Sequence, residues 1–251
     1  MGELTSIYFM WKREMIRFFR SKSRVIGSLG MPFFILAILG SGLNGAMSLP
    51  GTNGNYMEFI TPGVLGMVLL FASVFTGVMV IVDRQFGFLK ETLVAPVSRT
   101  SIVLGKSIGG ATAAIMQGVL MLVVAGLLGV NIPIASVPML LVIMTITSLA
   151  FVSLGIMIAS VLDDMHGFQL VMNFLIMPLF FLSGGLFPLN TAPEIVRIIS
   201  YLDPLTYSVE AMRYLFIGTA SIPIIWCIAV LSGFLVLTTI VAAYMFGKIE
   251  S

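Results

Sequence analysis

The feature that constrains this sequence most is the length of its charge-free stretches. No Asp, Glu, Lys or Arg occurs in 25–57, 59–82, 107–162, 167–193 or 214–247. An α-helix needs about 20 apolar residues to cross a bilayer, so each stretch can cross once, and the longest can cross twice. Charged residues make up only 10% of the chain, whereas soluble domains average about 25%. We therefore expect the chain to fold in a membrane.

The charge-free stretches predict helices rather than barrel strands. Strands of a membrane barrel alternate between apolar and polar residues, whereas these stretches are apolar in every direction. We expect the longest stretch to break between Asn131 and Pro138, because proline ends a helix. The predicted fold class is all-α integral membrane, a single transmembrane domain over 1–251. Its six transmembrane helices are expected near 25–44, 58–82, 107–130, 137–161, 168–187 and 223–246.

The basic residues predict the orientation of these six helices. Cytoplasmic connections carry an excess of Lys and Arg, and only Arg197 and Arg213 fall in the connections of the opposite side. The others lie before the first span, between the second and third, or after the sixth: Lys12, Arg13, Arg17, Arg20, Lys22, Arg24, Arg84, Lys90, Arg99, Lys106 and Lys248. Both termini are therefore expected in the cytoplasm, as an even number of spans requires.

A short motif, Gly105-Lys106-Ser107, resembles the end of a phosphate-binding P-loop. The complete motif needs a glycine where this chain has Thr100, and it follows a strand in a soluble domain. We therefore expect no ATP site and no enzymatic activity of its own. Lys106 is expected at the membrane boundary, where its ammonium would reach lipid headgroups.

Residues 3–22 are expected to form an amphipathic helix that lies in the membrane interface. Basic and acidic residues, Arg13 and Arg17 among them, would face the headgroups. Two interpretations stay open: a plain membrane anchor, or a docking surface for a cytoplasmic partner. The apolar side of the helix, facing lipid, would be formed by Leu4, Ile7, Tyr8, Trp11, Met15, Phe18 and Phe19.

The connection at 84–98 is the longest on the predicted cytoplasmic side, and its middle mixes apolar with charged residues. We expect a short helix that ends at Pro96, since a residue before proline disfavours the α conformation. It would be either a solvated linker or a contact for another protein. The residues expected to form such a contact are Arg84, Phe86, Leu89, Glu91, Leu93, Pro96 and Arg99.

The external stretch 189–216 is expected to hold two short helices that dip back into the membrane, the second starting at Pro204. Glu210 and Arg213 stand three residues apart and are expected to pair. The pair would lie either at the edge of a transport pathway or simply at the interface. The external residues singled out are Gly184, Gly185, Pro188, Pro204, Tyr207, Glu210 and Arg213.

The spans themselves contain almost no ionisable residue. An ion-coupled secondary transporter would place such groups near mid-membrane, and an intramembrane enzyme would need a catalytic cluster. Asp163, Asp164 and His166 suggest a helix cap more than a metal site. We expect no metal and no catalytic residues. The alternatives kept are an ion-coupled secondary transporter and a structural membrane protein without transport.

Together, these features resemble the ABC-2 type membrane subunits of ATP-driven exporters, closest to the branch that exports drugs and nodulation factors. Besides the basic N-terminal helix, the resemblance is carried by "DRQFGFLKETLVAPVSRTSIVLGK" at 83–106 and by "LSGGLFPLNTAPEIVRIISYLDPLTYSVEAMR" at 182–213. It covers the whole chain. The family often has Gly-Thr-Leu-Glu in the first of these stretches, where this chain has Phe88 and Lys90.

The resemblance implies a mechanism. Two permeases, forming a homodimer or heterodimer, would assemble with two cytoplasmic ABC ATPase subunits, which would bind ATP and magnesium. The 84–98 helix would fit a groove on the ATPase, and the N-terminal helix would be a second contact. The assembly would export an amphipathic or hydrophobic substrate, a drug-like compound (multidrug export) or a lipid, across a prokaryotic plasma membrane. Its other contacts would be membrane lipids, and no nucleic acid is implied.

Overall fold

The computed structural model describes residues 3–43, 55–87, 98–162 and 164–248, apart from the side chains of Arg24 and Arg99. This part of the chain is helical and contains no strand. Five helical stretches are long and apolar enough to cross a membrane: Tyr56–Gln85, Thr100–Leu127, Ile134–Val161, Met165–Leu182 and Ile224–Gly247. A sixth crossing is counted when Glu3–Arg20 and Val25–Gly40, bent by 68°, are taken together. The all-α membrane fold predicted from the sequence is confirmed.

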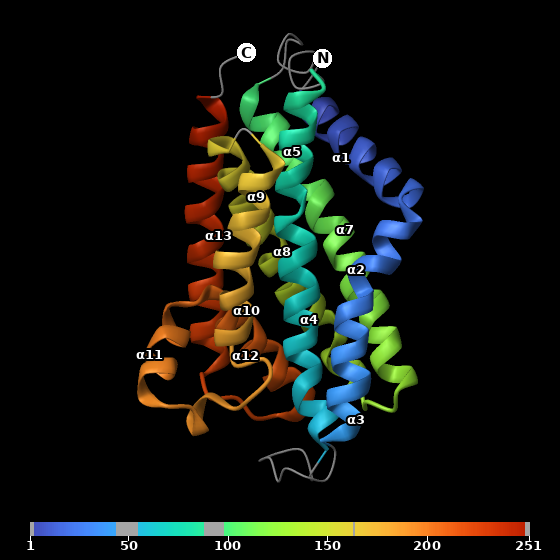
Figure 1. Ribbon diagram of the computed structural model, residues 1–251, viewed down its shortest axis with the longest axis vertical. Helices are drawn as coiled ribbons and strands as arrows, with labels where there is room; N and C mark the ends of the chain where they lie inside the picture. The colour runs from blue at the N-terminus through green and yellow to red at the C-terminus, as the bar shows by residue number, and fades with distance from the viewer. Residues whose placement is uncertain (1–2, 44–54, 88–97, 163, 249–251) are drawn as a thin grey trace.

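The chain enters the bundle through the bent pair. Helix α1 (Glu3–Arg20) is followed by α2 (Lys22–Phe34), the π-helical turn η1 (Ile35–Leu39) and α3 (Gly40–Gly42). Figure 1 shows α1 crossing the bundle obliquely while α2 runs along it. The helix expected over 3–22 therefore ends at Arg20, and Ser21 separates it from the first span.

The second and third spans are longer than expected. The second comprises α4 (Tyr56–Val74) and α5 (Thr76–Gln85), and Asn55 caps it by accepting hydrogen bonds from two backbone N–H groups. The third, α7 (Arg99–Leu127), begins eight residues before the predicted start at 107. Its start is fixed by Ser98, whose hydroxyl accepts from the Ser101 N–H.

The remaining elements follow the predicted order. The 3₁₀ turn η2 (Ile134–Ser136) leads into α8 (Val137–Val161), and the fifth span is built from α9 (Met165–Val171), the π-turn η3 (Met172–Ile176) and α10 (Met177–Leu182). Each π-turn lies beside a proline, Pro32 or Pro178, whose missing N–H disturbs the regular hydrogen-bond ladder. The last elements are η4 (Leu189–Thr191), α11 (Glu194–Leu202), α12 (Pro204–Ile217) and α13 (Ile224–Gly247).

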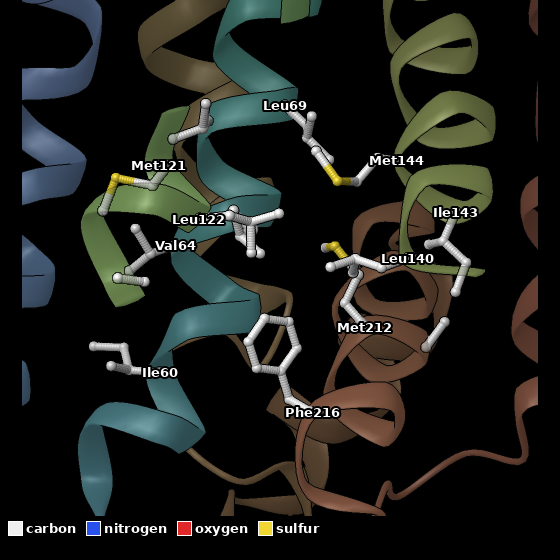
Figure 2. Packing of buried hydrophobic residues seen from close by; sticks show 14 of the residues in the cluster. Ile60, Val64, Leu69, Met121, Leu122, Leu140, Ile143, Met144, Met212 and Phe216 are labelled. Atoms are coloured by element: carbon white, nitrogen blue, oxygen red, sulfur yellow. The ribbon is translucent and has the colours of Figure 1, made fainter. Parts of the chain in front are cut away.

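Helix α8 lies at the centre of the bundle and packs against α4, α5, α7, α12 and α13. One of two apolar clusters joins α4, α7, α8 and α12, and Figure 2 shows part of it, with Leu69 of α4 close to Met144 of α8 and Phe216 of α12 below them. The start of α1, the end of α5, the start of α7 and the end of α13 lie at one end of the molecule, and α11 and α12 lie at the other (Figure 1). We call these the N-terminal end and the α12 end.

Candidate functional site

A buried carboxylate, Asp83, organises the N-terminal end of the bundle. It lies near the end of α5 with its side chain 1% exposed, and it accepts hydrogen bonds from Arg13 (2.9 Å) and Arg17 (3.0 Å) of α1. Its other oxygen accepts from the Lys106 ammonium of α7 at 2.5 Å. Three cations from two other helices thus converge on one acid. A buried charge needs such partners to offset its lost hydration.

The expected headgroup contact is wrong for Lys106, which is 2% exposed rather than at the lipid boundary. Arg13 and Arg17, whose side chains are 34% and 24% exposed, bind Asp83, a partner that the sequence did not predict. Glu14, expected on the polar face, is buried and accepts from Arg17 at 3.4 Å. The amphipathic pattern of the sequence could not show this, because it separates apolar from polar residues but does not reveal a charged partner on another helix.

The first residue of α1 that the structure describes is bound to the start of α7. The Ser98 hydroxyl donates to the Glu3 carboxylate at 2.6 Å, and the Ser101 hydroxyl donates to the same oxygen. These hydrogen bonds, that from Ser101 first, lower the pKa of the Glu3 carboxyl. Helix α1 thus binds the chain on both sides of the segment 88–97. Its arginines bind Asp83, which precedes the segment, and Glu3 binds Ser98 and Ser101, which follow it. We call this arrangement the α1 clasp.

Two glycines let α1 lie directly on α7. A Cβ at Gly105 would stand 2.5 Å from Met10 Cβ, and one at Gly109 would stand 2.7 Å from Glu14 Cβ. Small residues four positions apart on a helix are typical of close helix packing, and here the helix that packs on them is α1. Trp11 strengthens the contact by donating its indole N–H to Thr112 Oγ1 at 3.2 Å.

Of the residues predicted for coupling, the structure places Arg84 and Phe86. Arg84 donates to the Ala159 and Leu162 carbonyls at the end of α8, both at 3.3 Å, where a helix terminus favours a cation. Phe86 is 72% exposed at the N-terminal end. Leu89, Glu91, Leu93 and Pro96 lie outside the described residues, as does the side chain of Arg99.

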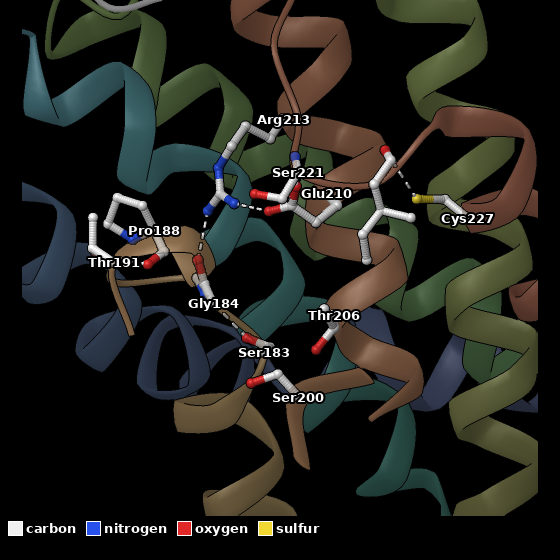
Figure 3. Close-up of polar contacts among 12 residues, drawn as sticks. Ser183, Gly184, Pro188, Thr191, Ser200, Thr206, Glu210, Arg213, Ser221 and Cys227 are labelled. Atoms are coloured by element: carbon white, nitrogen blue, oxygen red, sulfur yellow. Dashed lines mark hydrogen bonds and ion pairs between the residues drawn. The ribbon is translucent and has the colours of Figure 1, made fainter. Parts of the chain in front are cut away.

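A second polar cluster is buried at the α12 end (Figure 3). Arg213 and Glu210, 3% and 0% exposed, form the predicted ion pair inside the protein rather than in a simple interfacial position. Arg213 also donates to the Gly184 carbonyl at 2.6 Å and lies 4.1 Å from the centroid of the Phe59 ring. Glu210 accepts from the backbone N–H of Ser221. The pair therefore joins α12 to the turn after α10, to α4 and to the connection before α13.

The turn after α10 is held against α4 by backbone contact. A Cβ at Gly63 would stand 2.2 Å from the Gly185 carbonyl oxygen, so the two segments meet at glycines, which have no side chain. Tyr56 donates its hydroxyl to the Leu186 carbonyl at 2.8 Å beside this contact.

We expect Gly63→Ala to displace this turn and to lower the free energy of unfolding by about 1–3 kcal/mol, because a rigid backbone faces the added methyl group. Thermal unfolding of the purified protein would measure the loss. Gly233→Ala is the matched control, since a Cβ at Gly233 meets nothing within 4 Å. Equal melting temperatures for the two variants would contradict the expectation.

The other predicted external residues lie in the same region. Pro204 begins α12, which Asp203 caps by accepting from the Leu205 N–H at 2.8 Å. Tyr207 donates to the Tyr201 carbonyl at 2.8 Å, and Pro188 precedes η4. In the loop before the fifth span, Asp164 caps α9 as expected. The part of the chain that the structure describes holds no group of three or more His, Cys, Asp or Glu side chains suited to a metal ion.

The sequence interpretation missed Asp83 as the centre of the clasp and also missed Ser98, Ser101, Phe59 and Ser221. One signal was available: Asp83 ends a long apolar run, and an acid there needs a cation from another segment. The contacts to backbone groups and aromatic faces carry no comparable sequence pattern.

Comparison with known proteins agrees with the resemblance. The sequence matches the ABC-2 type transporter family over residues 5–217. It is 28% identical over 240 residues to Nodulation protein J of Rhizobium leguminosarum bv. viciae, covering 93% of this chain and 90% of that protein. It is 27% identical over 236 residues to the Inner membrane transport permease YadH of Escherichia coli, covering 90% and 89%.

A further relative is a Putative transport permease ycf38 of Cyanophora paradoxa, 28% identical over 216 residues that make up 85% of this chain and 74% of that protein. The match to the family extends from α1 through the clasp to the end of α12. The chain belongs to the ABC-2 type transporter family of membrane permeases.

Proposed function

We propose that this chain is the permease subunit of an ABC exporter, which moves an amphipathic or hydrophobic substrate out of the cytoplasm with ATP hydrolysed by a separate subunit. The observation that carries the proposal is the α1 clasp. It joins α1, α5 and α7 into one unit through buried ion pairs, and both ends of the segment 88–97 leave from this unit. A partner that moves this segment would move three helices together.

The partners follow from this assignment. Two ATPase subunits, carrying ATP and magnesium, would bind the 84–98 segment and α1 at the N-terminal end, with two permease chains side by side. That end would face the cytoplasm, in agreement with its excess of Lys and Arg. Closure of the ATPase pair can shift the equilibrium between the two permease states only to the extent that the closed pair binds one state more tightly than the other.

The membrane is supported by a relative that is named an inner membrane transport permease, so we assign the chain to the plasma membrane of a prokaryote. Export is the direction that the sequence resemblance implies. A drug-like compound or a lipid is the substrate class that suits the apolar spans.

Purification in mild detergent from the native host tests the proposal, and a stoichiometric soluble ATPase is expected to come with the chain. Phe86→Ala should weaken its binding about tenfold, because exposed aromatic anchors dominate such contacts. Ile134→Ala is the control: Ile134 is also exposed, and it lies in the connection after α7, away from the clasp. A chain that purifies alone under several gentle conditions would favour an ion-coupled transporter or a structural protein instead.

A further inference from the structure

The bend between α1 and α2 leaves a cavity of about 610 Å³ beside the α1 clasp. Its walls come from α1, α2, α4, α5 and α7, with Met177 of α10. Sites for small organic ligands have volumes of about 300–1,000 Å³, so the space suits a molecule rather than a few waters.

The lining of the cavity has an apolar and a polar part. Flexible methionines and an aromatic ring from four helices form much of the apolar wall: Met31, Met67, Phe71, Met79 and Met177. Methionine walls adapt to irregular or varied apolar ligands. Across the cavity, Ser28 of α2 donates to the Gln117 side-chain oxygen of α7 at 2.5 Å. Both charged lining residues, Glu14 and Arg17, come from α1.

The charge at this polar end favours an anion. Arg17 lines the cavity while it binds Glu14 and Asp83. Behind it, Arg13 and Lys106 bind the same Asp83. The cluster thus holds three cations and two carboxylates, an excess of one positive charge. In a site of low dielectric constant, one more anion would balance this excess, whereas a cation would increase it.

We propose that this cavity binds an anionic amphiphile, with its phosphate or carboxylate head at Arg17 and its alkyl chain along the methionine wall. The proposal rests on the proposed function, because it names the substrate class of the permease. It also places the ligand against the helix α1 that the clasp joins to the predicted ATPase contact, so that a bound head group and the partner would act on the same element.

Binding is measured on the permease alone, without an ATPase, in nanodiscs of phosphatidylcholine. The chain has two tryptophans, so Trp226→Phe leaves Trp11 as the reporter. Trp11 lies beside the cavity, since its Cα is 3.6 Å from the position of a Cβ on the lining residue Gly109. The probes share one dibrominated octadecyl chain, which quenches indole fluorescence, and carry a phosphate, a phosphocholine or a trimethylammonium head.

We expect the phosphate probe to bind at least tenfold more tightly than the other two. Arg17→Gln should remove this preference, and Arg17→Lys should retain most of it. Arg13→Gln is the matched comparison: it lowers the charge of the same cluster by one without lining the cavity, so it should reduce the preference less than Arg17→Gln does. Ala113→Leu, which fills the cavity, should weaken all three probes about tenfold. Ala229→Leu, on an exposed face of α13, should weaken none.

Anion binding in the cavity and assembly with an ATPase are tested separately. Equal affinity for the three heads, or equal effects of Arg17→Gln and Arg13→Gln, would overturn the proposal even if an ATPase co-purifies. Selective binding would support it even for a chain that purifies alone, which would contradict only the exporter assignment. Competition by added phosphatidylglycerol would identify a bilayer lipid as the occupant, and absence of competition a single-chain compound.

Discussion

Asp83→Asn is expected to lower the free energy of unfolding by about 3–5 kcal/mol, the range for removing one partner of a buried ion pair. The variant leaves Lys106, 2% exposed, without its carboxylate and removes the negative charge that Arg13 and Arg17 share. Helix α1 would then lose its main polar attachment to α5. The melting temperature in detergent should fall by about 10 °C, and ATPase co-purification should fall with it.

Asp83→Asn is compared with one control variant and one rescue variant. Asp164→Asn changes an exposed helix cap for which Asn is about as good as Asp, so its melting temperature should stay close to that of the unmodified chain. Asp83→Asn combined with Lys106→Met removes both the acid and its most buried partner, and it should recover much of the loss. If Asp83→Asn behaves like Asp164→Asn, the clasp does not hold α1, and the observation behind the proposed function fails.

Arg213→Met is expected to cost about 3–5 kcal/mol as well, but at the other end of the molecule. Glu210 would remain fully buried with only the Ser221 N–H as its partner, and the Gly184 carbonyl would lose its donor. The turn after α10 should loosen from α12. The melting temperature should drop, whereas ATPase binding should persist, because this cluster lies far from the clasp (Figure 1).

Arg197→Met is the matched control, since Arg197 is partly exposed and makes no ion pair among the described residues. Arg213→Met combined with Glu210→Leu should be more stable than Arg213→Met alone, because no unpaired charge stays buried. A double variant less stable than the single one would show that Glu210 acts mainly through Ser221 rather than through the ion pair.

The sequence by itself determined the membrane fold, the order of its helices and two local features. Apolar runs of sufficient length must form helices in lipid, because every backbone N–H and C=O has to be satisfied within the segment. The four-residue spacing of Gly105 and Gly109 is typical of a close helix contact, and Asp164 was expected to cap the helix that it does cap. These features depend on neighbours in the chain, so a linear pattern carries them.

Only the tertiary structure decided where the charges go. Lys106, Arg13 and Arg17 were expected among headgroups, because a charge next to an apolar run is normally solvated there. The packing of α1 on α7 instead brings them to Asp83, 23 to 70 residues away in the chain, and forms part of the wall of the cavity at the bend. The Arg213 contacts with Gly184 and Phe59 arise in the same way. The energy of a buried charge depends on which partners the fold brings within hydrogen-bond distance, and sequence spacing does not encode that distance.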